Sequence, residues 1–419
     1  MKLILKILGG LLALIMLGIA GIIAWPFIPV VQDRFGGAEH RAWLEDHRTE
    51  IDLGAADAGF DFGPEVHGAR FVVLAELHGY RAVQALDLAL LEHFTENGPA
   101  RTYLAELSPG QAFAFNQMVS GGDAAPARAV FDAWAQTQAQ WANQEFFQKL
   151  ERIRDLNASL PENRRIWFVG VDAPVDREGL AELVAANAET GVEPGFDSYA
   201  AVQALNVELG RDALQRESSN RYVHILANME TAAGLDPQRA FYGLWGLFHG
   251  SKTTINGSDP LALRLNREGG VFEDSLASLT TLCVEGCLNM MPARAMPEVL
   301  HGDGDPDYIY IPNNFDNVML ARVRGVNEIK AAAGEADIAA FRINGEDSPY
   351  ADGVRLSALS GYLMLVQGWE YGGPAARVTD YYIVMRNSAG LTPWSGTVHD
   401  VTGAAPETGI DAVAARLAE

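Results

Sequence analysis

Four apolar runs along the chain have the pattern of buried β-strands, and each ends on an ionisable residue. They span residues 71–78, 103–106, 166–172 and 241–249. Apolar runs of this length are typical of strands that are buried on both faces of a parallel sheet. Ligands of α/β sheets bind outside the carboxyl ends of the strands, so we expect the terminal side chains of these runs to converge in one cleft.

Helical patterns between the strands indicate an α/β fold. Apolar positions recur at helical spacing over 83–94, two helices are predicted within 124–156, and others within 176–236, the last over about 218–233. The short connection before the second strand favours parallel pairing. The sequence therefore predicts a central, mostly parallel sheet that is flanked by helices and carries helical insertions.

The pattern is less regular nearer the two ends of the chain. One helix is predicted over about 40–51, within an otherwise polar connection. Strand-like segments beyond residue 255 are 308–311, 339–343, 361–366 and 381–386. We treat 33–419 as one α/β domain with its core motifs at 70–260, and the pattern assigns no role to 261–419.

The amino terminus has the pattern of a membrane anchor. Residues 7–32 contain no charged side chain and are long enough to span the hydrocarbon core as a helix. Two lysines precede this run and Asp33 follows it, so the positive-inside rule places 33–419 outside the cytoplasm. A cleaved signal peptide, which would leave a secreted or periplasmic protein, is the alternative, but the run exceeds a usual signal core. We expect 1–32 to be an uncleaved transmembrane signal anchor.

The charge of the chain limits its partners. The 419 residues carry a formal net charge of −23, which repels phosphate backbones. We therefore expect no nucleic-acid partner, and a neutral or cationic small molecule is the electrostatically easier substrate. The sequence does not indicate an oligomeric state.

Cys283 and Cys287 are the only cysteines of the chain. Outside the cytoplasm such a pair more often closes a disulfide than binds a metal ion. A regular helix through both residues would strain this bond, and Gly286 offers the conformational freedom that relieves the strain.

The first strand ends on a carboxylate and an imidazole, Glu76 and His78, which are close enough in sequence to share one site. A lone pair of this kind is most often a satisfied ion pair. Ionisable residues recur at three further strand ends, and buried carboxylates are costly unless they are paired, so the pattern favours a functional site.

These segments resemble the erythromycin esterase-like family, whose wider superfamily also includes haem-uptake lipoproteins and certain metal-dependent membrane proteases. The resemblance covers about residues 70–260. It is carried by Val72-Val-Leu-Ala-Glu76-Leu-His78-Gly79, Leu104-Ala-Glu106, Trp141-Ala-Asn-Gln-Glu145 with Arg152 and Asn157, Phe168-Val-Gly-Val-Asp172, and Arg221 with Asn228 before Trp245-Gly-Leu-Phe-His249.

The resemblance implies a role for each matching residue. His78 corresponds to the family's water-activating histidine, and Glu76 and Glu106 to its supporting glutamates. Arg221 and His249 correspond to the second basic pair.

Three further side chains of the motifs have open roles. Asp172, at the end of its strand, is a further candidate for the site, although it could instead cap the next segment or pair with Arg165. Trp141 and Trp245 are predicted to lie in the core rather than to form substrate platforms.

The sequence also departs from the esterase pattern. The Glu-x-His spacing of Glu76 and His78 is the shorter one of the haem-uptake branch, Lys252 stands where a second histidine is expected, and Asp87 stands near the place of an arginine in the first helix. The resemblance therefore implies a shared site architecture rather than specificity for macrolides.

Three functions fit these residues. The first is hydrolysis of an ester or lactone, in which neutral His78 takes a proton from water, a glutamate stabilises the imidazolium, and Arg221 or His249 stabilises the oxyanion. The second is metal-dependent hydrolysis or proteolysis with a divalent ion, for which the candidate ligands are His78, His249, Glu76 and Glu106. The third is non-catalytic binding of a haem-like ligand.

Overall fold

The structure is a computed structural model, and it describes most of the globular part of the chain. The described residues are 14–18, 20, 21, 24, 27, 28, 31, 33, 35, 37–55, 57–97, 101–188, 190–302, 304–317, 321–360 and 371–401. The predicted strand at 361–366 lies outside them.

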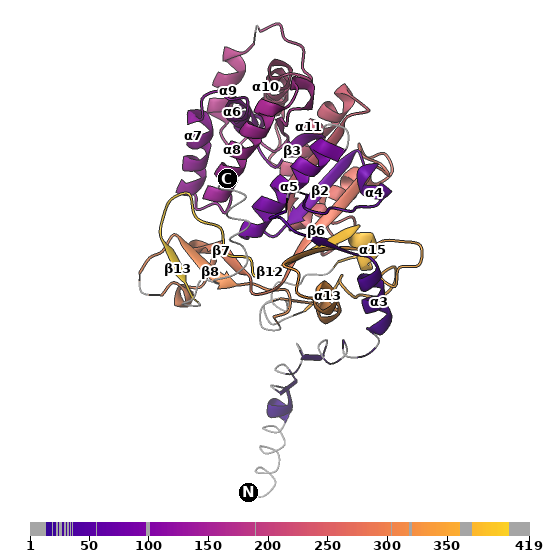
Figure 1. The fold of residues 1–419 in the computed structure, drawn as a ribbon. Coiled ribbons are helices and arrows are strands. Elements are labelled where there is room, and N and C mark those ends of the chain that lie inside the picture. Colours follow the sequence, from indigo (N-terminus) through magenta and orange to yellow (C-terminus); the bar gives the residue numbers. More distant parts are fainter. Residues whose placement is uncertain are drawn as a thin grey trace, which may run out of the picture.

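An eight-stranded sheet forms the centre of the fold (Figure 1). Its strands, in spatial order, are β1 (Arg48–Ile51), β10 (Ile338–Arg342), β12 (Tyr381–Arg386), β6 (Leu276–Glu285), β2 (Phe71–Glu76), β5 (Ala240–Gly246), β3 (Arg101–Ala105) and β4 (Phe168–Gly170). The strands from β12 to β4 are parallel, whereas β10 is antiparallel to both of its neighbours. The predicted central, mostly parallel sheet is confirmed.

Helices flank this sheet as the periodicity predicted. The larger ones are α5 (Arg81–Asn97), α6 (Pro109–Val119), α7 (Ala125–Gln136), α8 (Gln144–Ser159), α9 (Arg177–Ala186), α10 (Tyr199–Gln215) and α11 (Arg221–Leu235). Figure 1 shows α6 to α10 gathered as a helical layer beside the β3–β4 end of the sheet. Of these helices, α6 was not predicted from the sequence. Shorter helices are α3 (Ala38–Asp46), α4 (Pro64–His67), α12 (Leu261–Asn266), α13 (Val326–Ala333) and α15 (Ala375–Val378).

Some elements differ from the sequence-based prediction, and one predicted strand forms in a separate sheet. The helix predicted over 40–51 ends early, because the chain after α3 forms β1 and pairs with β10. The central strand β6 was not predicted. The predicted strand at 308–311 is β8 (Tyr308–Pro312), but it lies outside the main sheet. It forms a three-stranded sheet with β7 (Leu288–Pro292) and β13 (Val398–Asp400), and a two-stranded sheet joins β9 (Arg322–Val323) and β11 (Leu359–Ser360).

Cys283 and Cys287 form the predicted disulfide. Cys283 lies in β6 and Cys287 follows the turn after it, so the bond spans a strand and a turn rather than a helix. Gly286 in this turn has a φ of 66°, a conformation that glycine adopts without steric cost.

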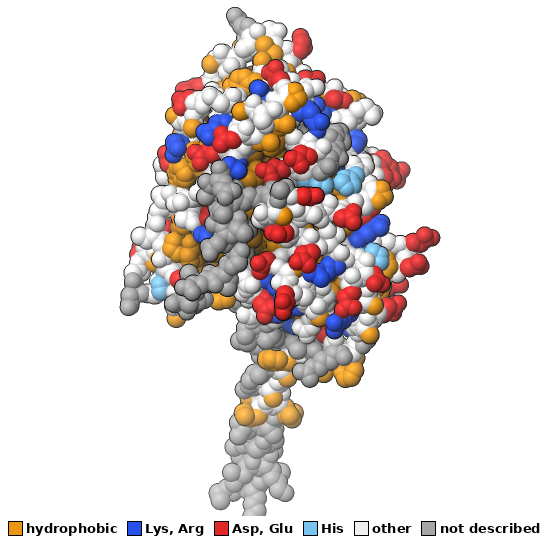
Figure 2. Space-filling view, in the orientation of Figure 1, with side chains coloured by type: hydrophobic (Ala, Val, Ile, Leu, Met, Phe, Trp, Pro, Cys, Tyr) orange, Lys and Arg blue, Asp and Glu red, His pale blue; other side chains and the backbone are white. Residues whose placement is uncertain are grey.

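The junction after the amino-terminal apolar run is fixed to the globular domain. Asp33 is buried and accepts hydrogen bonds from Arg322, from Nε of Arg324 at 2.7 Å and from the backbone N–H of Gly325 at 3.1 Å. Apolar side chains of the described residues 14–17 are exposed to solvent (Figure 2). Among the residues described, no helix combines the length and apolarity that crossing a bilayer requires, and most of the predicted anchor lies outside them.

Candidate active site

The carboxyl ends of four adjacent strands bring the predicted side chains together. Glu76 ends β2, Glu106 directly follows β3, and Asp172 follows β4. His249 lies in the short 3-10 helix Leu247–Gly250 after β5. The remaining two, His78 just after β2 and Arg221 at the first position of α11, complete the cluster. His78 pairs with Glu76, and the other four residues form one linked polar group.

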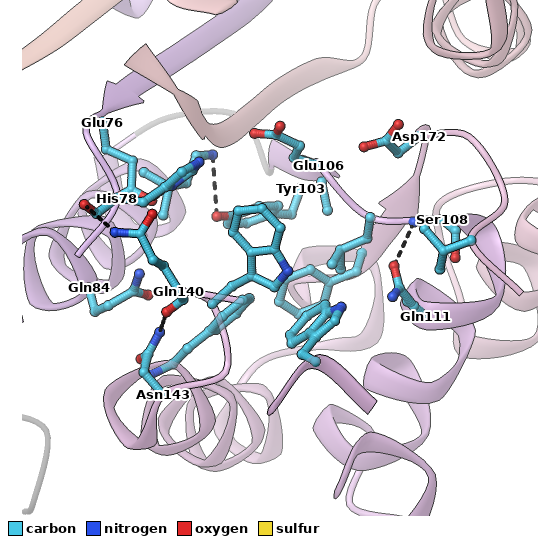
Figure 3. A pocket seen from close by; sticks show the side chains of 18 of the residues that line it. Glu76, His78, Gln84, Tyr103, Glu106, Ser108, Gln111, Gln140, Asn143 and Asp172 are labelled. Atoms are coloured by element: carbon cyan, nitrogen blue, oxygen red, sulfur yellow. Dashed lines mark hydrogen bonds and ion pairs between the residues drawn. The ribbon is translucent and has the colours of Figure 1, made fainter. Parts of the chain in front are cut away.

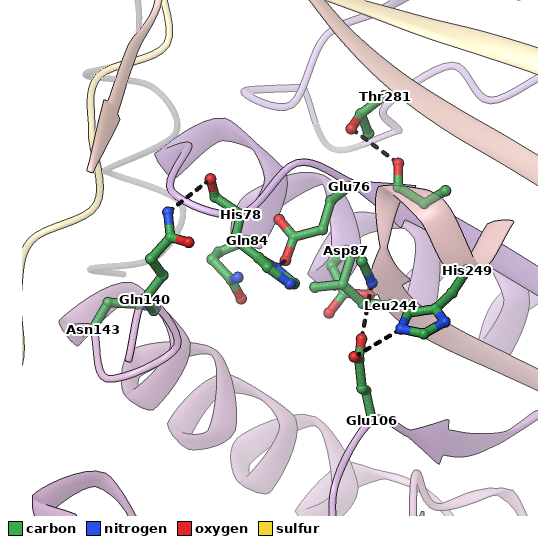
Figure 4. Close-up of polar contacts among 12 residues, drawn as sticks. Glu76, His78, Gln84, Asp87, Glu106, Gln140, Asn143, Leu244, His249 and Thr281 are labelled. Carbon is green, nitrogen blue, oxygen red and sulfur yellow. Dashed lines mark hydrogen bonds and ion pairs between the residues drawn. The ribbon is translucent and has the colours of Figure 1, made fainter. Parts of the chain in front are cut away.

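His78 is held by Glu76. Nδ1 of His78 lies 2.8 Å from Oε1 of Glu76, which leaves Nε2 as the second ring nitrogen for chemistry (Figure 4). Gly246 lies against this second nitrogen, because a Cβ at that position would be 3.1 Å from Nε2 of His78 and 3.6 Å from Cδ2 of His249. A side chain at 246 would therefore crowd both imidazoles.

Glu76 also changes the acidity of His78. Burial lowers the pKa of the imidazole, but the charge and hydrogen bond of Glu76, together with the charge of Glu106, outweigh burial. The pKa of His78 therefore lies above its ordinary value of 6.5. Glu76 thus makes the imidazole of His78 a stronger base than an isolated histidine.

Hydrogen bonds from distant segments of the chain hold the loop that carries His78. The backbone carbonyl of His78 accepts hydrogen bonds from Nδ2 of Asn289 at 2.6 Å and from Nε2 of Gln140 at 3.1 Å. Gly79 has a φ of 107°, and a Cβ there would lie 2.7 Å from the carbonyl oxygen of Met290. Sequence reasoning missed Asn289 and Gln140, because no local pattern marks a side chain that supports a loop elsewhere.

Glu106 connects the remaining polar residues. Its carboxylate accepts from Nη2 of Arg221 at 2.6 Å and from the backbone N–H of Gly246 at 2.8 Å, and Nε2 of His249 lies 3.3 Å away. Burial raises the pKa of Glu106, but the hydrogen bond and charge of His249 and the charges of His78 and Arg221 outweigh it. The pKa is thus held well below its usual value, so Glu106 is a carboxylate at neutral pH.

Arg221 is paired on both sides. Its Nε lies 2.8 and 3.0 Å from the two carboxylate oxygens of Asp172, and its Nη2 contacts Asp172 as well as Glu106. Burial lowers the pKa of Arg221, but Asp172 and Glu106 outweigh it, and the pKa rises. The alternative pairing of Asp172 with Arg165 is wrong, since Nε of Arg165 donates to the carbonyl of Leu160. Asp172 also accepts from the N–H of Ala173, so it caps the following turn in addition.

His249 lies behind this group. Its Nε2 is 3.4 Å from Nη1 of Arg221, its Nδ1 is 3.2 Å from the hydroxyl of Tyr222, and its ring packs edge-on against Trp245. The cavity beside the cluster is lined by Glu106 and Arg221 but not by His249. The contacts of His249 therefore fit a residue that holds Glu106 and Arg221 in position.

A cavity of about 120 Å³ opens beside the cluster (Figure 3). Glu76, His78, Glu106, Asp172 and Arg221 line its polar side. The apolar lining residues are Leu107, Trp134, Trp141, Phe146, Phe168, Val175, Leu244 and Leu391. The site thus combines ionisable groups with a wall that can receive an apolar part of a ligand.

The two tryptophans differ in their surroundings. Trp245 is fully buried and donates to the carbonyl of Leu104 at 3.0 Å, so its predicted place in the core is confirmed. Trp141 is 39% exposed, lines the cavity and meets the His78 ring edge-on at 5.0 Å. The prediction that Trp141 is a core residue is wrong, because Trp141 lies in the loop between α7 and α8 and its side chain lines the cavity.

The candidate metal ligands are arranged as two separate pairs. His78 pairs with Glu76, and His249 with Glu106, whose carboxylate also holds the cation Arg221. Within the described part of the chain, no group of three or more His, Cys, Asp or Glu side chains is placed to hold a metal ion. Lys252, at the position where the resemblance leads us to expect a histidine, pairs with Asp380 at 2.6 Å.

Comparisons with known proteins show similarity of the fold and no match of the sequence to a known family. No protein-family model matches this sequence, and no curated protein does. A solved structure of a mutant erythromycin esterase in its open conformation aligns with 82% of this chain and 98% of its own, with a TM-score of 0.52 at 13% identity. The chain has the fold of this esterase.

Two further solved structures share the fold. A protein from Bacillus cereus has a TM-score of 0.56 at 12% identity and covers 86% of this chain and 99% of its own. A succinoglycan biosynthesis protein has a TM-score of 0.53 at 11% identity and covers 85% and 99%. The likeness agrees with the sequence resemblance at the level of the fold.

Proposed function

We propose that this protein is a hydrolase in which His78 activates a water molecule for attack on an ester or lactone. The observation that carries the proposal is the pair of His78 and Glu76, joined at 2.8 Å and lining a cavity with an apolar wall. The fold shared with an erythromycin esterase supports the same class of reaction.

The chemistry follows from the two ring nitrogens of His78. In the proposed tautomer, Nδ1–H of His78 donates a hydrogen bond to Glu76, so Nε2 is the basic nitrogen. Nε2 takes a proton from water as the water oxygen attacks the carbonyl carbon. The tetrahedral intermediate then collapses, and Nε2 returns the proton to the leaving alkoxide. Glu76 stabilises the imidazolium between these steps.

Arg221 supplies positive charge at the cavity. It lines the cavity while Asp172 and Glu106 fix its orientation, so it can stabilise the oxyanion without reorganising. General-base assistance contributes roughly 10²–10⁴-fold in rate, and an electrostatic donor to the oxyanion roughly 10²–10³-fold. The proposed reaction uses both.

The pH dependence of turnover tests this proposal. Activity needs neutral His78, whose pKa is raised, so kcat/KM measured on a panel of esters and lactones should fall as pH drops through a value above 6.5. Glu76→Gln removes the charge that raises this pKa, while burial still lowers it, so the fall should move to lower pH and the maximal rate should decrease.

Three outcomes would contradict the proposed reaction. A profile whose acidic fall is unchanged in Glu76→Gln would remove His78 as the titrating base. Loss of turnover after dialysis against EDTA, restored by Zn²⁺, would favour the metal-dependent alternative. A wild-type protein inert to the whole panel would favour the ligand-binding alternative.

We further propose that the amino-terminal segment anchors the protein to a membrane, with the hydrolase domain outside the cytoplasm. Exposed apolar side chains at 14–17 support this, and Asp33 would hold the anchor close to the domain. The full chain should stay in the membrane fraction after a carbonate wash, whereas a chain lacking 1–32 should be released. Recovery of a mature protein that begins near Trp25 would instead demonstrate cleavage.

A further inference from the structure

A buried polar network lies beneath the candidate active site. Asp87 on α5 accepts from Nζ of Lys149 at 2.5 Å and from the hydroxyls of Tyr103 at 2.9 Å and Tyr242 at 2.6 Å. Asp87 and Lys149 side chains have no exposed surface. Burial and the charge of Asp87 raise the pKa of both tyrosines well above the usual value, so both stay protonated donors.

The network extends to the cavity through Gln84. Nζ of Lys149 donates a second hydrogen bond, of 2.7 Å, to Oε1 of Gln84. An ammonium group can only donate hydrogen bonds, so the carboxamide oxygen of Gln84 is the atom that faces Lys149. The amide NH₂ group of Gln84, which contains Nε2, must therefore point away from Lys149.

The cavity lies on the side of Gln84 that faces away from Lys149, since Gln84 lines the cavity and Lys149 does not. Gln84 is only 3% exposed and lines the cavity together with His78 and Glu76. Both close-ups place its carboxamide beside the loop of His78 (Figures 3 and 4). A position that only had to fill this space would favour an apolar side chain, because burying an ion pair and an amide costs desolvation energy.

We propose that Gln84 is a catalytic residue whose Nε2–H donates to the carbonyl oxygen of the substrate and to the oxyanion that forms from it. This inference rests on the proposed function. Lys149 is a positioning residue that fixes the carboxamide and polarises it, so its N–H becomes a stronger donor. The charge of Lys149 thereby acts on the reaction without facing the cavity, and Asp87 balances that charge.

Two substitutions separate donation from a structural role. Gln84→Met removes the donor and also leaves Lys149 with one partner fewer. Gln84→Glu removes the donor but keeps an acceptor for Lys149. If Gln84 only satisfies Lys149, the glutamate variant should behave as wild type, whereas a donor role predicts that both variants lose activity.

The kinetic test uses the full chain and p-nitrophenyl butyrate. In both Gln84 variants we expect kcat to fall by roughly 10²-fold, as for loss of one oxyanion donor, with a much smaller change in KM. Gln203→Met is the matched control, because Gln203 is a buried glutamine that donates to the carbonyl of Phe113 and does not line the cavity. Wild-type kcat in Gln84→Met, or its recovery in Gln84→Glu, would overturn the inference.

A binding measurement makes the test independent of turnover. The anion of p-nitrophenyl methylphosphonate mimics the tetrahedral intermediate, and calorimetry should show about tenfold weaker binding to Gln84→Met than to wild type or Gln203→Met. Equal binding, or no binding by wild type, would overturn the role of Gln84. If the binding depends on Gln84 but the wild type hydrolyses no ester, the donor role stands and the proposed hydrolysis fails.

Discussion

His78→Ala is expected to abolish hydrolysis of a good ester substrate while the protein stays folded. The substitution removes the group that takes the proton from water, and general-base assistance of this kind contributes roughly 10²–10⁴-fold in rate. His78 lies on a loop whose backbone is held by Asn289 and Gln140, and these contacts use its carbonyl rather than its side chain. These contacts can hold the loop in place without the imidazole.

Initial rates and circular dichroism on the same preparation measure the two parts of this expectation. His399→Ala is the control, because His399 lies in β13 of the small three-stranded sheet and does not line the cavity. A folded His78→Ala variant with undiminished turnover would eliminate the mechanism.

Glu106→Ala is expected to reduce kcat by at least about tenfold and to lower the melting temperature as well. Its carboxylate holds Arg221, the backbone N–H of Gly246 and His249 in one arrangement. Without it, Arg221 keeps the ion pair with Asp172 but loses its second carboxylate, and with it the orientation that suits the developing oxyanion. The buried N–H of Gly246 also loses its acceptor, which is costly in free energy of unfolding.

Two further variants locate the cause of this effect. His249→Ala should also cost at least about tenfold in kcat, because His249 acts through Glu106 and Arg221. Glu45→Ala, which removes only a solvent-exposed ion pair with Arg41, should leave kcat and melting temperature close to those of wild type. Wild-type kcat in folded Glu106→Ala would show that Arg221 does not need this partner.

The sequence alone was sufficient to predict a central, mostly parallel sheet and the convergence of the site. Strands buried on both faces appear as apolar runs, and parallel strands end at one edge, so Glu76, Glu106 and Asp172 could be expected to meet. Secondary structure was also predictable where helical periodicity was strong, as in α5 and α11. It was less so for β6, because its apolar, serine and threonine positions do not alternate as in a half-buried strand although nearly all of them are buried.

The partners of these residues were decided by the tertiary structure. Asn289 is 211 positions from His78, and Lys149 is 65 positions from Gln84, yet each pair is joined by a hydrogen bond. The chain order does not specify such contacts, because they depend on which strands become neighbours and on how the helices pack over them. Local propensity encodes where a strand ends, whereas the direction of a carboxamide or the pKa of an imidazole arises from groups that only folding brings within a few ångströms.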